Sequence, residues 1–324
     1  MRLADPQEHE ALEFYPLVDP QPRQLRRELL RDAWEAGKLT IGEVGTGKVP
    51  ELQFENRSGS DVLVLDGEQL IGAKQNRLTN RTIQLSAHST TTIPVSCMEQ
   101  GRWHFQSREF RHGDHCSPAG LRRVARRTEA TCAAESIAAS PEVLSCGQAD
   151  VWDEISSYES SLGERSTTGA LNDLYGHRAL DLEQLSRHFP SVDDQIGLLA
   201  FLGGEPLGMD VIGCHRLYAR LHKRLVSGYV MDALTMRGSR ARRRVDAAPA
   251  SEFLHKVQTA ERTDAPTVGC GTYRVLTDAV LGGELEVTRE MVHLSAFPRH
   301  GDSTSDGPPL SRAHRRRWRS RTAD

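Results

Sequence analysis

Polar and apolar residues alternate in short runs through residues 39–96, which is the period of β-strands rather than of helices. Valine, isoleucine, leucine and threonine fill the runs, and glycine, asparagine and serine separate them. Several short strands at regular spacing are typical of an antiparallel sandwich or barrel-like sheet. The predicted strands cover residues 39–44, 51–56, 61–68, 69–74, 81–86 and 91–96.

The pattern becomes helical after about residue 117, where apolar residues recur every three or four positions. The helices predicted by this spacing cover 117–139, 148–163, 170–189 and 215–236. Two apolar runs around Gly203 and Gly204 predict a hairpin over 195–213. We interpret the similar pair Gly282 and Gly283 as another hairpin turn. The remaining predicted strands cover 267–277 and 284–297.

Together these elements predict an α+β fold, in which an N-terminal antiparallel β-sandwich-like half packs with a C-terminal α+β half and helices lie between them. The two halves are expected to share one core. The predicted parts are an irregular lead-in ending in a short helix at 23–36 (1–37), a β-rich subdomain (38–104), a helical connector (105–190), an α+β subdomain (191–298) and a disordered basic tail (299–324).

Charge and composition narrow the class of protein. The chain of 324 residues carries a net charge of -3. Its last fifteen residues are rich in arginine, so the rest is more acidic than the whole. This argues against nucleic-acid binding except through the tail. No apolar run is long enough to span a membrane, and acids stand where a signal peptide has its apolar core. We therefore expect a cytoplasmic protein with reduced cysteines; neither a cofactor nor an oligomeric state is specified.

One block of polar residues, DGEQLIGAKQNR, follows the predicted strand 61–68. Glu68, Gln75, Asn76 and Arg77 combine a carboxylate, two amides and a guanidinium near strand ends. Arginine binds phosphate or carboxylate through two parallel hydrogen bonds, and amides can read ribose or base edges. This combination favours a polar ligand site. The structural alternative is a tight turn followed by a buried Glu68–Arg77 ion pair.

A second block, IPVSCMEQGRW, adds candidate chemistry. Cys97 would be a nucleophile if Arg102 lowered its pKa, and Glu99 would be a general base or a metal ligand. Trp103 would stack on a base. The structural alternatives are a buried Cys97, a Glu99–Arg102 bridge and a Trp103 packed in the core.

Two weaker features complete the inventory. His112, Asp114, His115 and Cys116 include metal-ligand residue types, but their spacing matches no established zinc pattern, so we assign no metal site. His293 lies on a predicted strand and is interpreted as a core or edge histidine.

These blocks resemble an uncharacterised bacterial family, the ARG and rhodanese-phosphatase-superfamily-associated protein domain. The resemblance is carried by DGEQLIGAKQNR, IPVSCMEQGRW, QIGLLAFLGGEPLGMDVIG, LVSGYVMDAL and MVHLSAF, which together extend from about residue 40 to 298. GCG at 269–271 departs from the expected Gly-hydrophobic-Gly turn. The family's association with ADP-ribosylglycohydrolases implies nucleotide or ADP-ribose metabolism, and it implies no catalytic residues.

Two functions follow as hypotheses. In the first, the protein binds a nucleotide-like or ADP-ribose-like ligand in a polar cleft. The residues assigned to binding are Gln75, Asn76, Arg77, Arg102 and Trp103, with a contribution from Glu68. In the second, it is a hydrolase or transferase on such a ligand, with Glu68 and Glu99 as acid–base or metal-binding residues and Cys97 as a further catalytic candidate.

Overall fold

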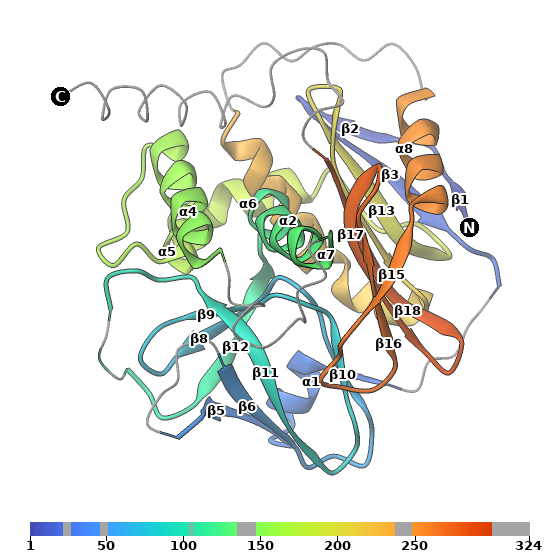
Figure 1. Ribbon diagram of the computed structural model, residues 1–324. Coiled ribbons are helices and arrows are strands. Elements are labelled where there is room, and N and C mark those ends of the chain that lie inside the picture. The colour runs from blue at the N-terminus through green and yellow to red at the C-terminus, as the bar shows by residue number, and fades with distance from the viewer. Residues whose placement is uncertain are drawn as a thin grey trace.

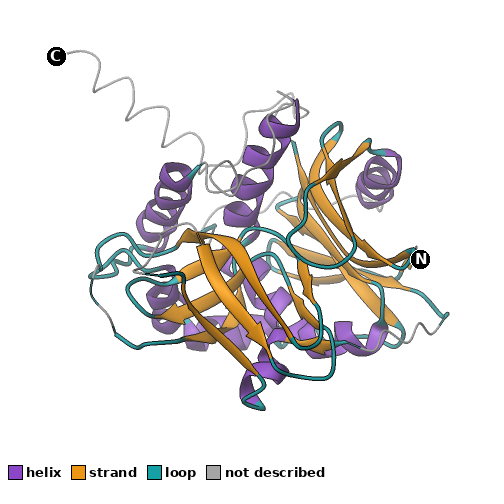
Figure 2. Cartoon of the chain, turned by 60° about the horizontal axis from the view of Figure 1, so that its bottom comes forward, coloured by secondary structure: helices purple, strands orange, loops and turns teal. Residues whose placement is uncertain are grey.

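The computed structural model describes residues 1–21, 27–45, 51–102, 104, 106–134, 147–236 and 248–299. This part of the chain contains antiparallel sheets and helices, which confirms the predicted α+β class (Figure 1). Figure 2 shows two sheet-rich regions with helices packed around and between them. The predicted tail lies outside the described residues apart from Arg299.

The larger sheet has nine strands in the order β1-β3-β13-β14-β18-β17-β16-β15, and β2 pairs with β3. Its strands are β1 (Arg2–Leu3), β2 (Gln7–His9), β3 (Leu12–Val18), β13 (Gln195–Leu202), β14 (Glu205–Ile212), β15 (Arg262–Ala265), β16 (Thr272–Leu276), β17 (Val280–Val287) and β18 (Glu290–Pro298). All its pairings are antiparallel. The predicted hairpin around Gly203 and Gly204 is confirmed as β13 and β14.

The N-terminal half contains a six-stranded sheet, β12-β8-β9-β11-β6-β5, and a three-stranded sheet, β10-β7-β4. Their strands are β4 (Glu28–Leu29), β5 (Leu39–Glu43), β6 (Glu51–Asn56), β7 (Val62–Val64), β8 (Glu68–Gly72), β9 (Arg77–Thr79), β10 (Ile83–Leu85), β11 (Ser89–Cys97) and β12 (Phe110–Cys116). With the short helix α1 (Leu30–Glu35), both sheets contribute side chains to one apolar core, which includes Phe54, Val64 and Phe110.

Helices cover both faces of the larger sheet. α7 (His215–Leu234) contacts β13 and β14 of that sheet and β12 of the N-terminal half, while α2 (Ala119–Ala134) packs on β16 and β17. α8 (Ala248–Thr259) places Phe253 and Val257 in a separate core on the opposite face. The other helices are α4 (Gln148–Leu162), α5 (Leu171–His177) and α6 (Ala179–Ser186).

A single apolar cluster joins the two halves. It contains Leu63 and Ile71 from the N-terminal half, Leu198 and Phe297 from the larger sheet, and Tyr229 from α7. Burying such side chains contributes roughly 1.5–3 kcal/mol each. Because these residues come from both halves, the predicted shared core is confirmed.

Several predicted elements need correction. Residues 1–20 were expected to be irregular, yet β3 is buried along its whole length and pairs with β13. The connector 105–190 begins with a strand, β12, that pairs with β8. The expected single strand 284–297 is a hairpin, because Thr288 and Arg289 form a turn with positive φ angles.

The pair Gly282–Gly283 is not a turn but lies inside β17. A Cβ at Gly283 would collide with Tyr273 and come within 2.7 Å of Arg126 Nη1. Glycine is therefore required there by the close approach of neighbouring side chains.

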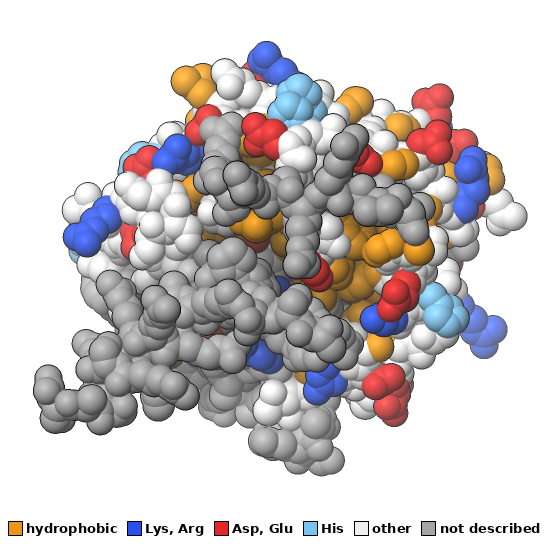
Figure 3. Space-filling model, turned by 90° about the horizontal axis from the view of Figure 1, so that it is seen from above, with side chains coloured by type: hydrophobic (Ala, Val, Ile, Leu, Met, Phe, Trp, Pro, Cys, Tyr) orange, Lys and Arg blue, Asp and Glu red, His pale blue; other side chains and the backbone are white. Residues whose placement is uncertain are grey.

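Within the described residues, no helix combines the length and apolar character needed to cross a membrane. Figure 3 shows acidic and basic side chains interspersed around the face seen from above, beside an area of apolar side chains. Among the described residues visible on this face, charges of both signs are therefore mixed.

Candidate functional site

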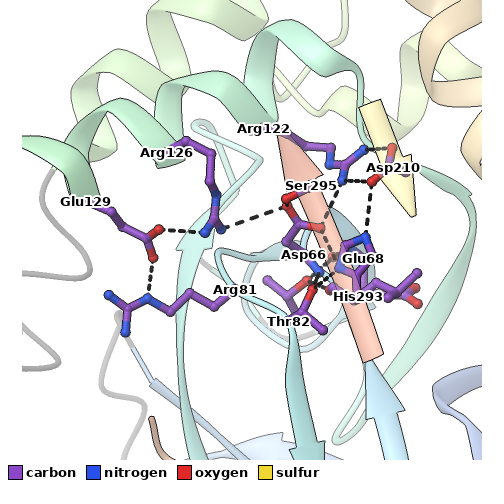
Figure 4. A network of polar contacts seen from close by, with 12 residues as sticks. Asp66, Glu68, Arg81, Thr82, Arg122, Arg126, Glu129, Asp210, His293 and Ser295 are labelled. Carbon is purple, nitrogen blue, oxygen red and sulfur yellow. Dashed lines mark hydrogen bonds and ion pairs between the residues drawn. The ribbon is translucent and has the colours of Figure 1, made fainter. Parts of the chain in front are cut away.

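Two buried aspartates share one buried arginine (Figure 4). Asp66 follows β7, Asp210 lies in β14 and Arg122 projects from α2. Arg122 donates to Asp210 through Nη1 at 2.8 Å and Nη2 at 2.5 Å, and to Asp66 Oδ1 through Nη2 at 2.9 Å. Burial alone would raise both aspartate pKa values, but the Arg122 charge reverses this and lowers them. Both carboxylates are therefore ionised at neutral pH.

His293, on β18, lies beside the two aspartates. Its Nε2 is 3.1 Å from Asp210 Oδ1, and its Nδ1 is 2.6 Å from the hydroxyl of Thr82. Asp66, Asp210 and His293 have ligand-type atoms within 4.8 Å of one another, which is close enough for a metal ion. However, the Arg122 guanidinium already donates to both carboxylates, so a cation bound between them would have to displace it.

The network continues along α2. Arg126 donates to Glu129 at 2.5 Å and contacts the Tyr273 hydroxyl, and Arg81 pairs with the same glutamate. Counting Asp66, Asp210 and Glu129 against Arg81, Arg122 and Arg126, acids and arginines balance. We call these six residues, with His293, the central network. All seven are buried, and their charges cancel if His293 is neutral.

Glu68 belongs to a different contact from the one predicted. It is buried, and its two carboxylate oxygens bind the guanidinium of Arg224 on α7, one at 3.1 Å. The predicted Glu68–Arg77 pair is therefore wrong. The reason lies in the packing of α7 against β12, which brings a residue 156 positions away to the start of β8.

Both carboxylate oxygens of Glu99 accept hydrogen bonds. It accepts hydrogen bonds from Arg102 at 2.7 and 2.9 Å, from the Thr168 hydroxyl at 2.7 Å and from the Asn76 backbone N–H at 3.0 Å. Burial would raise its pKa, but these donors lower it. The predicted structural Glu99–Arg102 bridge is confirmed. Glu68 and Glu99 thus lie in separate ion pairs, and the structure does not bring their carboxylates together.

Arg102 also holds the turn at residues 72–76. It donates to the carbonyls of Gly72 and Ala73 and to Asn76 Oδ1. Gln75 donates to the Glu99 carbonyl at 2.9 Å, and Asn76 Oδ1 accepts from the Gly72 N–H at 3.0 Å. The two predicted polar blocks therefore meet in space, where they fix a turn.

Arg77 directly follows this turn and is the first residue of β9. It is directly opposite Leu70 and Cys97 in the sheet, and Leu70 belongs to the apolar core of the N-terminal half. Its Nη1 donates to Gln75 Oε1 at 3.1 Å, and its Nε has no acceptor. We call Arg77, Gln75, Asn76 and Cys97 the Arg77 corner.

Six arginines are buried in the described part of the chain, and five of them pair with a carboxylate. Those five are Arg81, Arg102, Arg122, Arg126 and Arg224. Arg77 is 3% exposed, and no carboxylate of the described residues lies within ion-pair distance of it. Burial of an unpaired charge costs several kcal/mol, and arginine does not escape that cost by losing its proton.

Cys97 does not supply the missing negative charge. It is fully buried, its Sγ donates to Gln75 Oε1 at 3.3 Å, and burial raises the pKa of its thiol despite the nearby Arg77. A neutral thiol is a poor nucleophile, so the geometry gives no support to a catalytic Cys97. Trp103, the remaining predicted ligand-binding residue, lies outside the described residues.

The possible metal ligands of β12 are not brought together. His112 contacts Trp34 and Glu35, whereas His115 stacks on Tyr175 at 4.6 Å. Burial lowers the pKa of His115 to about 4, so it is neutral. Sequence reasoning missed the central network because its members lie far apart in the chain. The available signals were Asp210 inside an apolar run and arginines recurring along α2.

Comparison with known proteins places the chain in one family. Searches of curated proteins and of solved structures each found no significant match. The profile of the ARG and Rhodanese-Phosphatase-superfamily-associated Protein domain matches residues 1–297, which is nearly the whole described chain. The chain therefore belongs to the family of ARG and Rhodanese-Phosphatase-superfamily-associated Protein domains.

Proposed function

We propose that this protein binds a small, phosphate-bearing, nucleotide-like ligand of the ADP-ribose type, and that Arg77 is the anchor for the phosphate. One observation carries the proposal: Arg77 is the buried arginine without a carboxylate partner among the described residues. A bound anion would supply the missing charge. Phosphate suits the role because a guanidinium presents paired donors to its oxygens.

Neighbouring groups support a ligand at this position. The side-chain amide nitrogen of Asn76 has no acceptor within the described residues and is available to a ribose or base. The preceding Lys74 is partly exposed, with 28% of its side chain accessible, so the corner lies close beneath the surface. The family name links the domain to ARG proteins, which we interpret as ADP-ribosylglycohydrolases, and this supports the choice of ligand class.

Thermal unfolding with ADP-ribose, NAD, ATP or inorganic phosphate tests the proposal. A ligand at about 100 times its Kd adds roughly 2.7 kcal/mol to the free energy of unfolding and raises Tm. We expect this shift for at least one nucleotide in the unmodified protein and in Arg111→Met, which changes an exposed arginine. Arg77→Met should lose it. The proposal fails if no ligand raises Tm, or if Arg77→Met keeps the full shift.

The second hypothesis, a hydrolase or transferase, stays a prediction. Glu68 and Glu99 are each engaged by arginine, so neither is free to act as a base in this arrangement. A different relay is present, in which Thr82, His293 and Asp210 are hydrogen-bonded in series, as in nucleophile–base–carboxylate sites. All three are buried. Product analysis after incubation with each bound nucleotide tests for turnover, with His293→Gln as the variant.

A further inference from the structure

The charge that surrounds Arg77 is nearly balanced. Glu43 and Glu99 both lie beside this corner, because the backbone N–H of Lys74 donates to Glu43 and that of Asn76 donates to Glu99. Glu43 is engaged by Lys74, whose backbone N–H donates to it at 3.2 Å and whose ammonium lies 3.9 Å away. Glu99 is engaged by Arg102. Among these five charged side chains, two acids face three cations, and Arg77 is the cation that is not paired with either acid.

The free edge of the Arg77 guanidinium sets the shape of the anion. Nη1 already donates to Gln75, Nε has no acceptor, and the other side chain of the described residues that is hydrogen-bonded to Arg77 is the neutral thiol of Cys97. Nε and Nη2 form the side edge of a guanidinium, which binds two oxygens in parallel. A phosphodiester has two non-bridging oxygens and one negative charge. It matches both the free edge and the leftover charge.

Resting on the proposed function, we propose that the Arg77 corner selects a phosphoryl group with a single negative charge, as in a phosphodiester or an internal diphosphate, over a terminal phosphate monoester. A monoester is close to doubly charged at neutral pH. Its second charge would face Glu43 and Glu99 with no cation left to neutralise it. Desolvation also costs more for the doubly charged group, because that cost grows with the square of the charge.

Calorimetric titration with AMP and cyclic AMP tests this selectivity, since the two share a nucleoside and differ in phosphate charge. At pH 7.5 we expect cyclic AMP to bind at least tenfold more tightly than AMP. At pH 5.5 most AMP is singly charged, because its second pKa is near 6, so its affinity should rise by roughly 20-fold while that of cyclic AMP stays constant. ADP-ribose and ribose 5-phosphate provide a second pair with the same expected order.

Two variants separate selectivity from binding. Glu43→Gln removes a repelling charge and keeps an acceptor for Lys74, so AMP should gain affinity relative to cyclic AMP. Arg77→Lys keeps the charge and loses the two-donor edge, so it should lose most of the preference. AMP binding as tightly as cyclic AMP at pH 7.5, with Arg77→Met abolishing both, overturns the selectivity and leaves the proposed function standing. If none of the four ligands binds, or if Arg77→Met binds them unchanged, the proposed function falls and this inference with it.

Discussion

The central network and the Arg77 corner solve the problem of buried charge in opposite ways. In the central network, Arg122 lies between Asp66 and Asp210 and donates hydrogen bonds to both. In the Arg77 corner, the guanidinium donates to one amide oxygen and faces a neutral thiol. The first arrangement is complete within the chain. In the second, the described residues provide no carboxylate for the arginine.

Asp232, on α7, shows why the sign of an unpaired charge matters. It is buried and accepts hydrogen bonds from the backbone N–H groups of Ala119 and Gly120, with no cation of the described residues within ion-pair distance. Burial raises its pKa to about 6, so it can escape its charge by taking up a proton. Arg77 has no such escape, because arginine stays protonated in proteins. For that reason our ligand proposal rests on the unpaired arginine and not on the unpaired aspartate.

Removing Arg122 should have the largest effect on stability. Arg122→Met leaves buried Asp210 without an arginine and leaves Asp66 with only the more distant Arg126 at 3.9 Å, and breaking a buried pair in this way costs about 3–5 kcal/mol. Urea unfolding at pH 7 measures the loss, with Arg111→Met as the exposed control. A loss below about 1 kcal/mol would mean that the central network is open to solvent or to another cation, and would remove the contrast with Arg77.

The second effect is a dependence of stability on pH. The pKa of Asp232 is raised to about 6 in the folded chain, compared with 3.8 for the unfolded chain. Its protonation therefore contributes fully to the free energy of unfolding below pH 3.8, and this contribution is lost as pH rises through 6. Between pH 5 and pH 8 this amounts to about 1 kcal/mol. Asp232→Asn keeps an oxygen that can accept from the backbone N–H groups of Ala119 and Gly120, and it should remove this pH-dependent part of the free energy of unfolding. Unfolding curves of both proteins across that range measure it, and parallel curves would contradict the assignment.

The fold was predictable where the local sequence of one segment determines its secondary structure. The hairpin around Gly203 and Gly204 and the helix α7 follow from local periodicity and turn residues. β3 was missed because it is buried on both faces and contains Pro16, so it shows neither alternation nor an ordinary strand composition. Its partner β13 lies far away in the chain. No local pattern encodes such a pairing.

In the candidate site, too, contacts between residues close in sequence were predictable and contacts between distant residues were not. The bridge between Glu99 and Arg102 spans three residues and was foreseen as an alternative, because such spacing favours contact. Glu68 pairs with Arg224 on α7, which only the packing of that helix against β12 decides. Sequence could single out Arg77 as a candidate. It could not show that this arginine, unlike the other buried ones, has no carboxylate partner within the part of the chain that the structure describes.

The smallest expected effect on stability is also the most informative. Arg77→Met replaces an unpaired buried charge by an apolar side chain of similar length, so the ligand-free protein should stay within about 1 kcal/mol of the unmodified one or become more stable. Arg102→Met should instead lower the free energy of unfolding by about 3–5 kcal/mol, because it leaves the buried carboxylate of Glu99 without its arginine. The same arginine-to-methionine change should therefore leave the free energy of unfolding unchanged or raise it at residue 77, and lower it at residue 102. Urea unfolding of both variants, without added nucleotide, tests this. If Arg77→Met is as damaging as Arg102→Met, then Arg77 already has its counter-charge in the free protein, and no anion is needed to complete the corner.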